Sequence, residues 1–458
     1  MQSLPQVYND HHKAILYGSA AAVRILAAVA FPGLPDTLSL RAELATPVNS
    51  FKRLQEGLFL YQRGLDPYNG GIFHQAPLLL PLFSLLPSPA FASGTLLSVL
   101  LYTGLDLLVA ECLYYIAQSG AAYISRRYRS PRHDRTWTPA SVAAIYLFNP
   151  YTLLTCLARP TSVFATFFTL LSVSHACQAR TATAAFALAI ASYISLHPAL
   201  LLPPVGLLCY DRLCLLQHQG RDATSNGAAI EKPTSTKIAH DQRLQARPLE
   251  LTLRFSGIYL ATFLLLLTLS RLLLPSWSFM PSVYLTPLTL PDLTPNSGLW
   301  WYFFTEMFDA FRSFFLGVFW LHMLSYSVPF CLRLNRQPLA AVVLIMGVLA
   351  IFEPYANAGD AGVWLSCLCL LSHLFELSSS HRYTFPALAT LLYATLLGPA
   401  FHHLWIYAGS GNANFFYAIT LVWSLALLVL LADTLYAALR DEYEAEVPEA
   451  KGREIRQV

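Results

Sequence analysis

The stretch ANFFYAITLVWSLALLVLLADTLYAAL, residues 413–439, decides the fold, because it is a long apolar run with Asp433 as its only charged residue. A helix needs about 20 apolar residues to cross the hydrocarbon core of a bilayer. In hydrocarbon every backbone amide must be paired internally, and this run is too long and too uniformly apolar to be a barrel strand. The stretch therefore predicts a transmembrane helix.

Similar apolar runs recur along the whole chain. Of its 458 residues, 55% are hydrophobic and 12% are charged, whereas a soluble domain carries roughly 25% charged residues. The run 184–215 would extend about 48 Å as one helix, so we expect two helices interrupted at His197-Pro198 or Pro203-Pro204. The proline-rich run 76–90 is either a span or a re-entrant segment. The full set of expected spans is 14–32, 76–90, 94–118, 138–157, 161–178, 184–215, 252–275, 308–333, 337–355, 359–379, 384–405 and 413–439.

The sequence thus predicts an all-α, polytopic membrane protein of about 11–13 transmembrane helices that forms a single multispan domain over 1–458. Its formal net charge of +3, with acids and bases mixed, argues against a nucleic-acid partner. The eight cysteines lie mostly inside or at the ends of apolar runs, so we expect no disulfide framework.

Basic loops set the expected orientation. The loop 119–137 carries five arginines against Asp134, and the polar, flexible loop 216–250 is also basic, so both are expected in the cytoplasm. Counting spans onward places the tail 440–458 there too and puts 406–412 on the opposite, lumenal side. The side of the N-terminus depends on whether 76–90 crosses the membrane.

The first outer loop, 33–75, contains an expected amphipathic helix. Between Thr46 and Gly64 the apolar residues Phe51, Leu54, Leu58 and Tyr61 recur at helical spacing and share one face. Asn49 or Ser50 is placed to cap its start and Gly64 to end it. Such a helix is expected to lie on the lipid surface.

The segment DLTPNSGLWWYFFTEMF, residues 292–308, concentrates aromatic residues beside a proline-made turn. One interpretation is an aromatic belt at the membrane interface. The other is the mouth of a lipid-facing groove, with Trp300, Trp301, Phe304 and Glu306 as its residues. Glu306, Asp309 and Arg312 follow one another at intervals of about one turn, and an ion pair among them would fix the entrance of the helix.

The segment FHHLWIYAGSGNANFFY, residues 401–417, carries a turn of small and amide residues at the start of a span. Small residues allow close approach of the backbone, and the amides of Asn412 and Asn414 both donate and accept, which suits a sugar or phosphate headgroup. The alternative is a simple helix cap. The adjacent His402 and His403 diverge on a helix and are too few for a metal site.

Scattered polar residues form a third group, and no catalytic residue is expected among them. A carboxylate of the first loop, Asp36 or Glu43, would be the general base of a sugar transferase, but neither has a neighbouring acid. Ordinary solvated loop acids explain both residues better. The other members of the group are Asp66, His74, Asn149-Pro150, His197 and Asp360.

Four segments of this sequence resemble the U subunit (PIG-U) family of GPI transamidase, the complex of the endoplasmic reticulum that attaches glycosylphosphatidylinositol anchors to proteins. They are EGLFLYQRGLDPYNGGIFHQAPLLL at 56–80, LFNPYTLLTC at 147–156, PDLTPNSGLWWYFFTEMF at 291–308 and HLWIYAGSGNANFFYAITL at 403–421. The resemblance implies an architecture similar to that of lipid-linked (GT-C-type) mannosyltransferases. It also implies a role in binding the GPI lipid beside a separate, cysteine-protease-like catalytic subunit.

The family's GPI contacts carry over to Asn412 and Asn414, which this sequence retains. The resemblance implies a non-catalytic subunit of the endoplasmic reticulum membrane, with no cofactor and no metal. The alternative function is a mannosyltransferase of GPI precursor synthesis. A transporter is disfavoured, because neither a chain of charges within the spans nor an inverted repeat is visible in the sequence.

Overall fold

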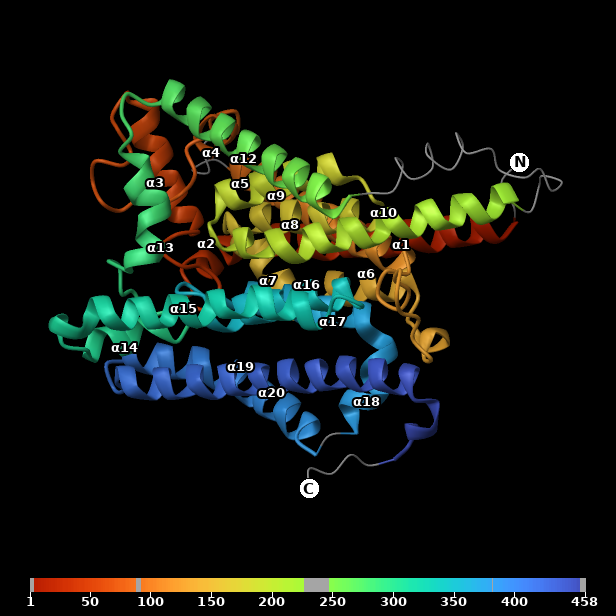
Figure 1. The fold of residues 1–458 in the computed structure, drawn as a ribbon. Coiled ribbons are helices and arrows are strands. Elements are labelled where there is room, and N and C mark those ends of the chain that lie inside the picture. Colours follow the sequence, from red (N-terminus) through yellow and green to blue (C-terminus); the bar gives the residue numbers. More distant parts are fainter. Residues whose placement is uncertain (1–3, 88–91, 226–246, 381, 454–458) are drawn as a thin grey trace.

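The structure, a computed structural model, describes residues 4–87, 92–225, 247–380 and 382–453, and its regular elements over these ranges are helices (Figure 1). This confirms the predicted fold class. The α-helices are α1 Leu4–Ala30, α2 Leu34–Ser39, α3 Phe51–Gln62, α4 Leu79–Ser84, α5 Ala92–Gln118, α6 Pro139–Phe148, α7 Pro150–Ala158, α8 Ser162–Cys177, α9 Thr181–Ile194, α10 Leu202–Ser225, α12 Pro248–Leu273, α13 Thr286–Thr289, α14 Trp300–Glu306, α15 Asp309–Arg333, α16 Pro338–Phe352, α17 Ala358–Leu368, α18 Phe375–Ser379, α19 Thr384–Ile406 and α20 Ala413–Glu446.

Among the described residues, 8 helices are long and apolar enough to cross a membrane, or 9 if the bent pair α6 and α7 counts as one span. Three shorter apolar helices, α8, α9 and α16, coincide with further predicted spans. The run 184–215 is divided as predicted: α9 ends at Ile194, the short 3₁₀ helix His197–Leu201 follows, and α10 begins at Leu202.

The predicted span 138–157 is not one straight helix. It bends by 56° between α6 and α7. Asn149 ends α6 and caps α7, with its side chain accepting a hydrogen bond from the amide of Tyr151, and Pro150 occupies the first turn of α7. Asn149 also donates to the carbonyl of Gly362 on α17 at 3.1 Å, which ties the bend to a neighbouring helix.

The segment 76–87 contributes only α4, whose 6 residues are too few to cross a membrane. α1 and α5 lie against each other and run antiparallel, because Lys13 pairs with Glu111 at 2.7 Å and Arg24 pairs with Asp106. The start of α1 therefore lies at the same end of the bundle as the loop 119–137, which resolves the side of the N-terminal helix.

The long helices lie roughly along one direction, and the two ends of the bundle differ (Figure 1). The left end in the figure carries α3, α13, α14 and the turn between α19 and α20. The right end carries the start of α1, the loop 119–137, α18 and the end of α20. This arrangement separates 406–412 from 119–137 and 440–446, as the charge pattern predicts. Most of the loop 216–250 and the end of the tail 440–458 lie outside the described residues.

The lumenal and cytoplasmic sides remain a prediction, which thiol labelling of sealed microsomes tests. We expect Ser410→Cys to be labelled only after the membrane is opened and Asp134→Cys to be labelled without opening, because both positions are exposed at opposite ends of the bundle. Of the eight native cysteines, seven are buried and Cys331 is half-buried, so the parent chain serves as the background control. Labelling of both introduced cysteines from the same side would contradict the topology.

The core centres on α16, which is buried around most of its circumference and packs against α10, α15, α17 and α20. A helix that is apolar all round is either a membrane span or part of a protein core, and the burial of α16 places it in the core. A Cβ built on Gly347 of α16 would lie 2.6 Å from the ring of Trp364 on α17. The glycine therefore allows the close approach that is typical of helices packed within membranes.

The amphipathic helix is present as α3, and Gly64 follows it with φ of +71°. The prediction that its apolar face contacts lipid is wrong. Phe51 and Leu54 are buried in a cluster with Phe83, Tyr102 and Phe164, and the rings of Phe51 and Phe83 lie 6.1 Å apart. An apolar face has the same sequence pattern whether it contacts lipid or protein. Here residues of α4, α5 and α8 cover the apolar face of α3.

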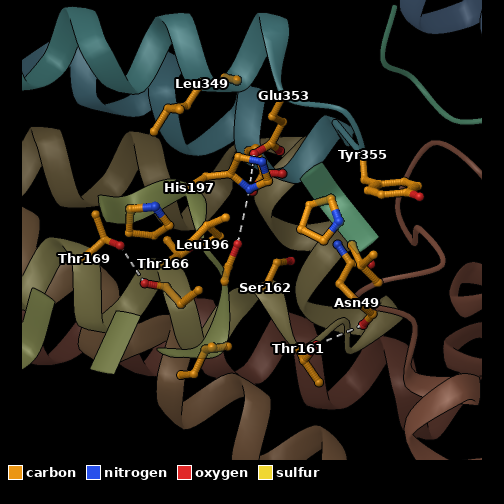
Figure 2. A pocket seen from close by; sticks show the side chains of 18 of the residues that line it. Asn49, Thr161, Ser162, Thr166, Thr169, Leu196, His197, Leu349, Glu353 and Tyr355 are labelled. Atoms are coloured by element: carbon orange, nitrogen blue, oxygen red, sulfur yellow. Dashed lines mark hydrogen bonds and ion pairs between the residues drawn. The ribbon is translucent and has the colours of Figure 1, made fainter. Parts of the chain in front are cut away.

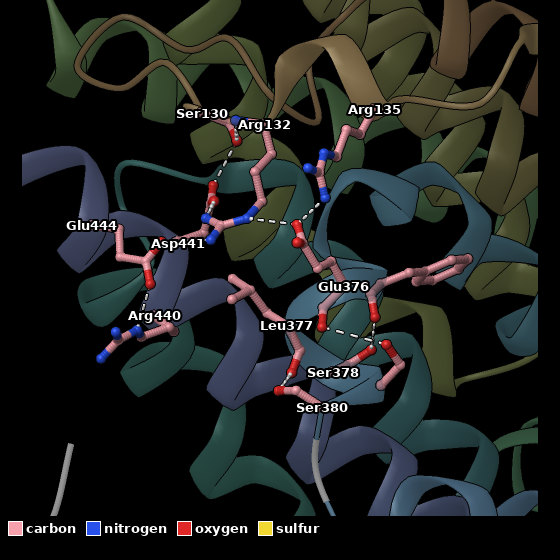
Figure 3. A network of polar contacts seen from close by, with 12 residues as sticks. Ser130, Arg132, Arg135, Glu376, Leu377, Ser378, Ser380, Arg440, Asp441 and Glu444 are labelled. Atoms are coloured by element: carbon pink, nitrogen blue, oxygen red, sulfur yellow. Dashed lines mark hydrogen bonds and ion pairs between the residues drawn. The ribbon is translucent and has the colours of Figure 1, made fainter. Parts of the chain in front are cut away.

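Two buried groups of charges join distant parts of the chain. At the right end of Figure 1, Arg132 of the loop 119–137 pairs with Asp441 at 2.6 Å and with Glu444 at 2.5 Å, both on α20 (Figure 3). Within the spans, Arg24 of α1 pairs with Asp106 of α5. The first group attaches a loop to the last helix, and the second joins the first two long helices.

Candidate functional site

The two segments that the sequence singled out, 292–308 and 401–417, meet in the structure. The ring of Trp301 on α14 stacks on Trp405 of α19 with centroids 6.0 Å apart and contacts Tyr417 of α20 edge-on at 5.9 Å. Tyr302 stacks on Tyr417 at 4.6 Å. We call this group, with Asn412 and Asn414, the turn site; it lies at the end of the bundle that carries α3 and α13 (Figure 1).

Local hydrogen bonds shape the turn that precedes α14. The side chain of Asp292 accepts from the amide of Thr294 at 2.9 Å, and the side chain of Asn296 accepts from the amide of Gly298 at 2.7 Å. A Cβ on Gly298 would lie 2.7 Å from that same Asn296 oxygen and 3.3 Å from the backbone of Ala356. A glycine is therefore required where this turn lies against the loop after α16.

The turn between α19 and α20 folds back onto the end of α19. The amides of Ser410 and Gly411 both donate to the carbonyl of Leu404, at 3.0 and 3.1 Å. Gly409 has φ of +64°, a conformation that glycine adopts without strain. This compact loop fixes the position from which α20 starts.

Asn412 and Asn414 have different roles in the turn site. The side chain of Asn412 accepts from the amide of Phe415 at 3.3 Å and so caps α20. The side-chain oxygen of Asn414 accepts from the hydroxyl of Tyr302, which links α20 to α14. Both asparagines are exposed. The helix-cap interpretation therefore holds for Asn412, whereas Asn414 is oriented by an aromatic neighbour.

The structure places three of the four predicted groove residues inside the protein. Trp300, Trp301 and Phe304 are 1%, 2% and 2% exposed. Trp300 donates to the carbonyl of Phe352 at 2.8 Å, and its ring contacts Phe319 and Trp320 of α15. These rings join α14 to α15, α16 and α20 and do not line an open groove, whereas Glu306 is exposed, one turn from Tyr302.

Arg312 does not join Glu306 as the sequence suggested. Its guanidinium donates to the carbonyl of Leu290 at 2.5 Å and lies over the ring of Phe304 at 5.6 Å. α14 ends at Glu306 and α15 begins at Asp309, so the two residues are not on one continuous helix. The arginine instead closes the loop that leads into α14.

His402 and His403 point in different directions, as expected for neighbours on a helix. His402 is buried beside the ring of Phe416 at 5.1 Å, and His403 is exposed and stacked on Tyr407 at 5.4 Å. Among the described residues no group of three or more His, Cys, Asp or Glu is arranged to hold a metal ion.

The loop acids have structural partners. Asp36 is not simply solvated, because it pairs at 2.5 Å with Arg159, which is fully buried after α7. Asp66 accepts from the hydroxyl of Ser278 at 2.7 Å, and Glu43 lies 3.7 Å from Arg41. The contacts of Asp36 and Asp66 hold the first loop onto the bundle, whereas the contact of Glu43 lies within the loop. The prediction that Asp36 stands alone is wrong, although its side chain is 66% exposed, as expected for a loop acid.

A cavity of about 130 Å³ lies between α8, α16 and α17, and the sequence did not predict it (Figure 2). Three residues from the scattered polar group, His74, His197 and Asp360, line it together with Glu353. His197 lies 3.6 Å from the carboxyl of Glu353 and stacks on the ring of Trp320 at 5.8 Å. The available signal was Glu353-Pro354 at the end of an apolar run, a few residues before Asp360.

Burial alters the acidity of groups around this cavity. Glu353 lies in the loop between α16 and α17, where burial, together with the neighbouring carboxyl of Asp360, raises its pKa well above the ordinary range. Burial lowers the pKa of His74, which donates from its Nδ1 to the backbone carbonyl of Ser282 at 3.0 Å.

Comparisons with known proteins agree with the four segments on which the resemblance rests. The family model described as GPI transamidase subunit PIG-U matches residues 18–423. The chain is 33% identical to the human GPI-anchor transamidase component PIGU over 92% of this chain and 93% of that protein. It is 34% identical to the GPI transamidase component GAB1 of Saccharomyces cerevisiae over 94% of this chain and 95% of that protein. The chain is 32% identical to the GPI transamidase component GAB1 homolog of Schizosaccharomyces pombe over 93% of this chain and 93% of that protein.

Proposed function

The chain belongs to the PIG-U family of GPI transamidase subunits, and from that membership we propose that it holds the GPI lipid for a catalytic subunit supplied by a separate chain. It is a multi-pass, non-catalytic component of the transamidase complex. The proposed location is the membrane of the endoplasmic reticulum. The alternative of a mannosyltransferase is not favoured, because the curated relatives are named as transamidase components.

The observation that carries the proposal is the exposure of Asn412 and Asn414, two residues apart, on a hydrogen-bonded turn. The turn is fixed by the Leu404 carbonyl and by Tyr302, so the two amides are held in place before a ligand arrives. Preorganised amides donate and accept hydrogen bonds without adding a charge, which suits a glycan or a phosphate. Glu306, exposed one turn from Tyr302, marks the neighbouring surface where the headgroup would continue.

The asparagines are tested in cells that lack the endogenous subunit, by the surface display of a GPI-anchored reporter. We expect Asn412→Lys to reduce display more than Asn412→Ala, because a long side chain also fills the turn. Asn414→Ala should reduce it as well, since a lost hydrogen bond to a charged group costs about 1.5–3 kcal/mol, roughly ten- to a hundredfold in affinity.

Asn412→Ser separates capping from binding. Serine caps a helix as well as asparagine does but lacks the amide, so this variant should assemble normally and still lose display. Asn335→Lys, at an exposed asparagine of the opposite end, is the matched control. Full display by Asn412→Ser and Asn414→Ala, with normal co-purification of the complex, would show that the turn is only a structural cap.

A further inference from the structure

The cavity between α8, α16 and α17 is a separate feature from the turn site (Figure 2). We propose that it binds a neutral, hydroxyl-rich ring, namely a single sugar residue or a polyol of similar size. The proposal concerns residues distant in sequence from Asn412 and Asn414 and does not depend on their role.

The size of the cavity favours an organic ligand over a single ordered water. A buried water needs about 10–15 Å³ of such space, and the cavity offers about 130 Å³. Much of its wall is apolar, with Leu349, Ala350 and Val363 on one side and Leu196 and Pro198 on another. Ligand pockets commonly combine such walls with a few polar groups that fix orientation.

The charges of the lining exclude an anion. Glu353 and Asp360 both face the cavity, and the lining includes neither lysine nor arginine among the described residues. A phosphate would meet two carboxyl groups and no cation to offset them. The lining therefore disfavours an anionic ligand.

The polar groups are arranged for hydroxyl groups. Ser162 and Thr166 lie one turn apart on α8 and line the cavity opposite Glu353 (Figure 2). His197 is buried, and its Nε2 has no hydrogen-bond partner among the residues that the structure describes. Leaving such a group unpaired is costly, and a sugar hydroxyl, which both donates and accepts, satisfies it in either tautomer.

The first loop and the segment after α12 close one side of the cavity. Val48 and His74 come from the loop 33–75, and Val283 and Pro287 from the segment that ends in α13. These elements lie at the end of the bundle that also carries the turn site (Figure 1). The experiment therefore includes both a free sugar and a lipid-linked one.

The test uses the full-length chain with its co-purifying subunits, held in an amphipol because common detergents contain sugars. A methyl hexopyranoside bearing a diazirine is photolysed, and labelled peptides are identified by mass spectrometry. We expect label on α8 or on the α16–α17 segment, competition by methyl α-mannopyranoside or a dodecyl mannoside, and no competition by inorganic phosphate or octanol. If only the dodecyl mannoside competes, the ligand is a lipid-linked sugar. If methyl α-mannopyranoside competes as well, the ligand is a free sugar.

Variants locate the label in the cavity. Ala165→Leu fills the space and Glu353→Gln removes one carboxyl, and each should reduce labelling about tenfold while the complex still assembles. Ala310→Leu and Glu250→Gln make the same changes at exposed positions and should have no effect. Asn412→Lys should also leave labelling unchanged, which separates this proposal from the turn site. Absence of label from an assembled wild-type complex, equal competition by octanol, or labelling that survives Ala165→Leu would overturn it.

Discussion

Arg24→Leu is expected to remove most of the folded chain from membranes, because it leaves the carboxyl of Asp106 buried without its partner. The two side chains are 0% and 2% exposed, and Asp106 also accepts from the hydroxyl of Tyr146 at 2.5 Å. Arg24 further donates to the carbonyl of Leu147 at 2.9 Å. Breaking a buried pair by removing one partner costs about 3–5 kcal/mol, a large part of the stability of a domain.

Restoring neutrality should restore the fold. The double variant Arg24→Leu/Asp106→Leu replaces the pair by apolar side chains, which is often neutral or stabilising in a buried site. The readout is the amount of monodisperse chain recovered in detergent and its midpoint of thermal unfolding. If the single and double variants lower the recovered amount and the thermal midpoint equally, the stabilisation comes from the packing of the Arg24 stem and not from the ion pair.

Arg132→Met is the second substitution with a large expected effect. Arg132 joins Asp441 and Glu444, whose side chains are 0% and 3% exposed, and Ser130 donates to Asp441 at 2.7 Å (Figure 3). Without the guanidinium Asp441 remains buried with no cationic partner, whereas Glu444 keeps Arg440 at 2.7 Å, so we expect a loss of about 3 kcal/mol in the free energy of unfolding. Detachment of the loop 119–137 should also make it sensitive to added protease.

The neighbouring arginine provides a matched control. Arg135 pairs with Glu376, but its side chain is 62% exposed, so Arg135→Met should cost less than about 1 kcal/mol. Adding Asp441→Asn and Glu444→Gln to Arg132→Met should recover part of the lost free energy of unfolding, because it removes the buried negative charges. Equal effects of Arg132→Met and Arg135→Met on thermal unfolding and protease sensitivity would show that the buried network does not hold the loop.

The fold class was predictable because apolar length alone distinguishes a membrane helix. The bend between α6 and α7 was missed because Asn149-Pro150 lies inside a continuous apolar run, although an asparagine before a proline is a recognisable helix start. The covered face of α3 was assigned to lipid because hydrophobicity does not distinguish lipid from protein. Only the packed positions of α4 and α5 settle that question.

The two candidate sites differ in how many of their residues the sequence alone could predict. Asn412 and Asn414 stand in a long, specific segment, so their motif was visible without a structure. The cavity was not visible, because His197, Glu353 and Ser162 come from segments far apart in the chain and meet only through the packing of α8 and α16. Tyr302 was likewise seen as part of an aromatic run, and its hydrogen bond to Asn414 depends on how α14 lies against α20.

The length of α20 has a consequence for the surrounding lipid. Its 34 residues extend about 51 Å, whereas the hydrocarbon core is about 30 Å thick. One end is attached through Asn414 to Tyr302 and the other through Asp441 and Glu444 to Arg132, so the helix cannot slide along its axis. A thicker or thinner bilayer is then accommodated by tilting of the helix together with its neighbours or by local adjustment of the bilayer. The orientation of Asn412 and Asn414 is thereby coupled to membrane thickness.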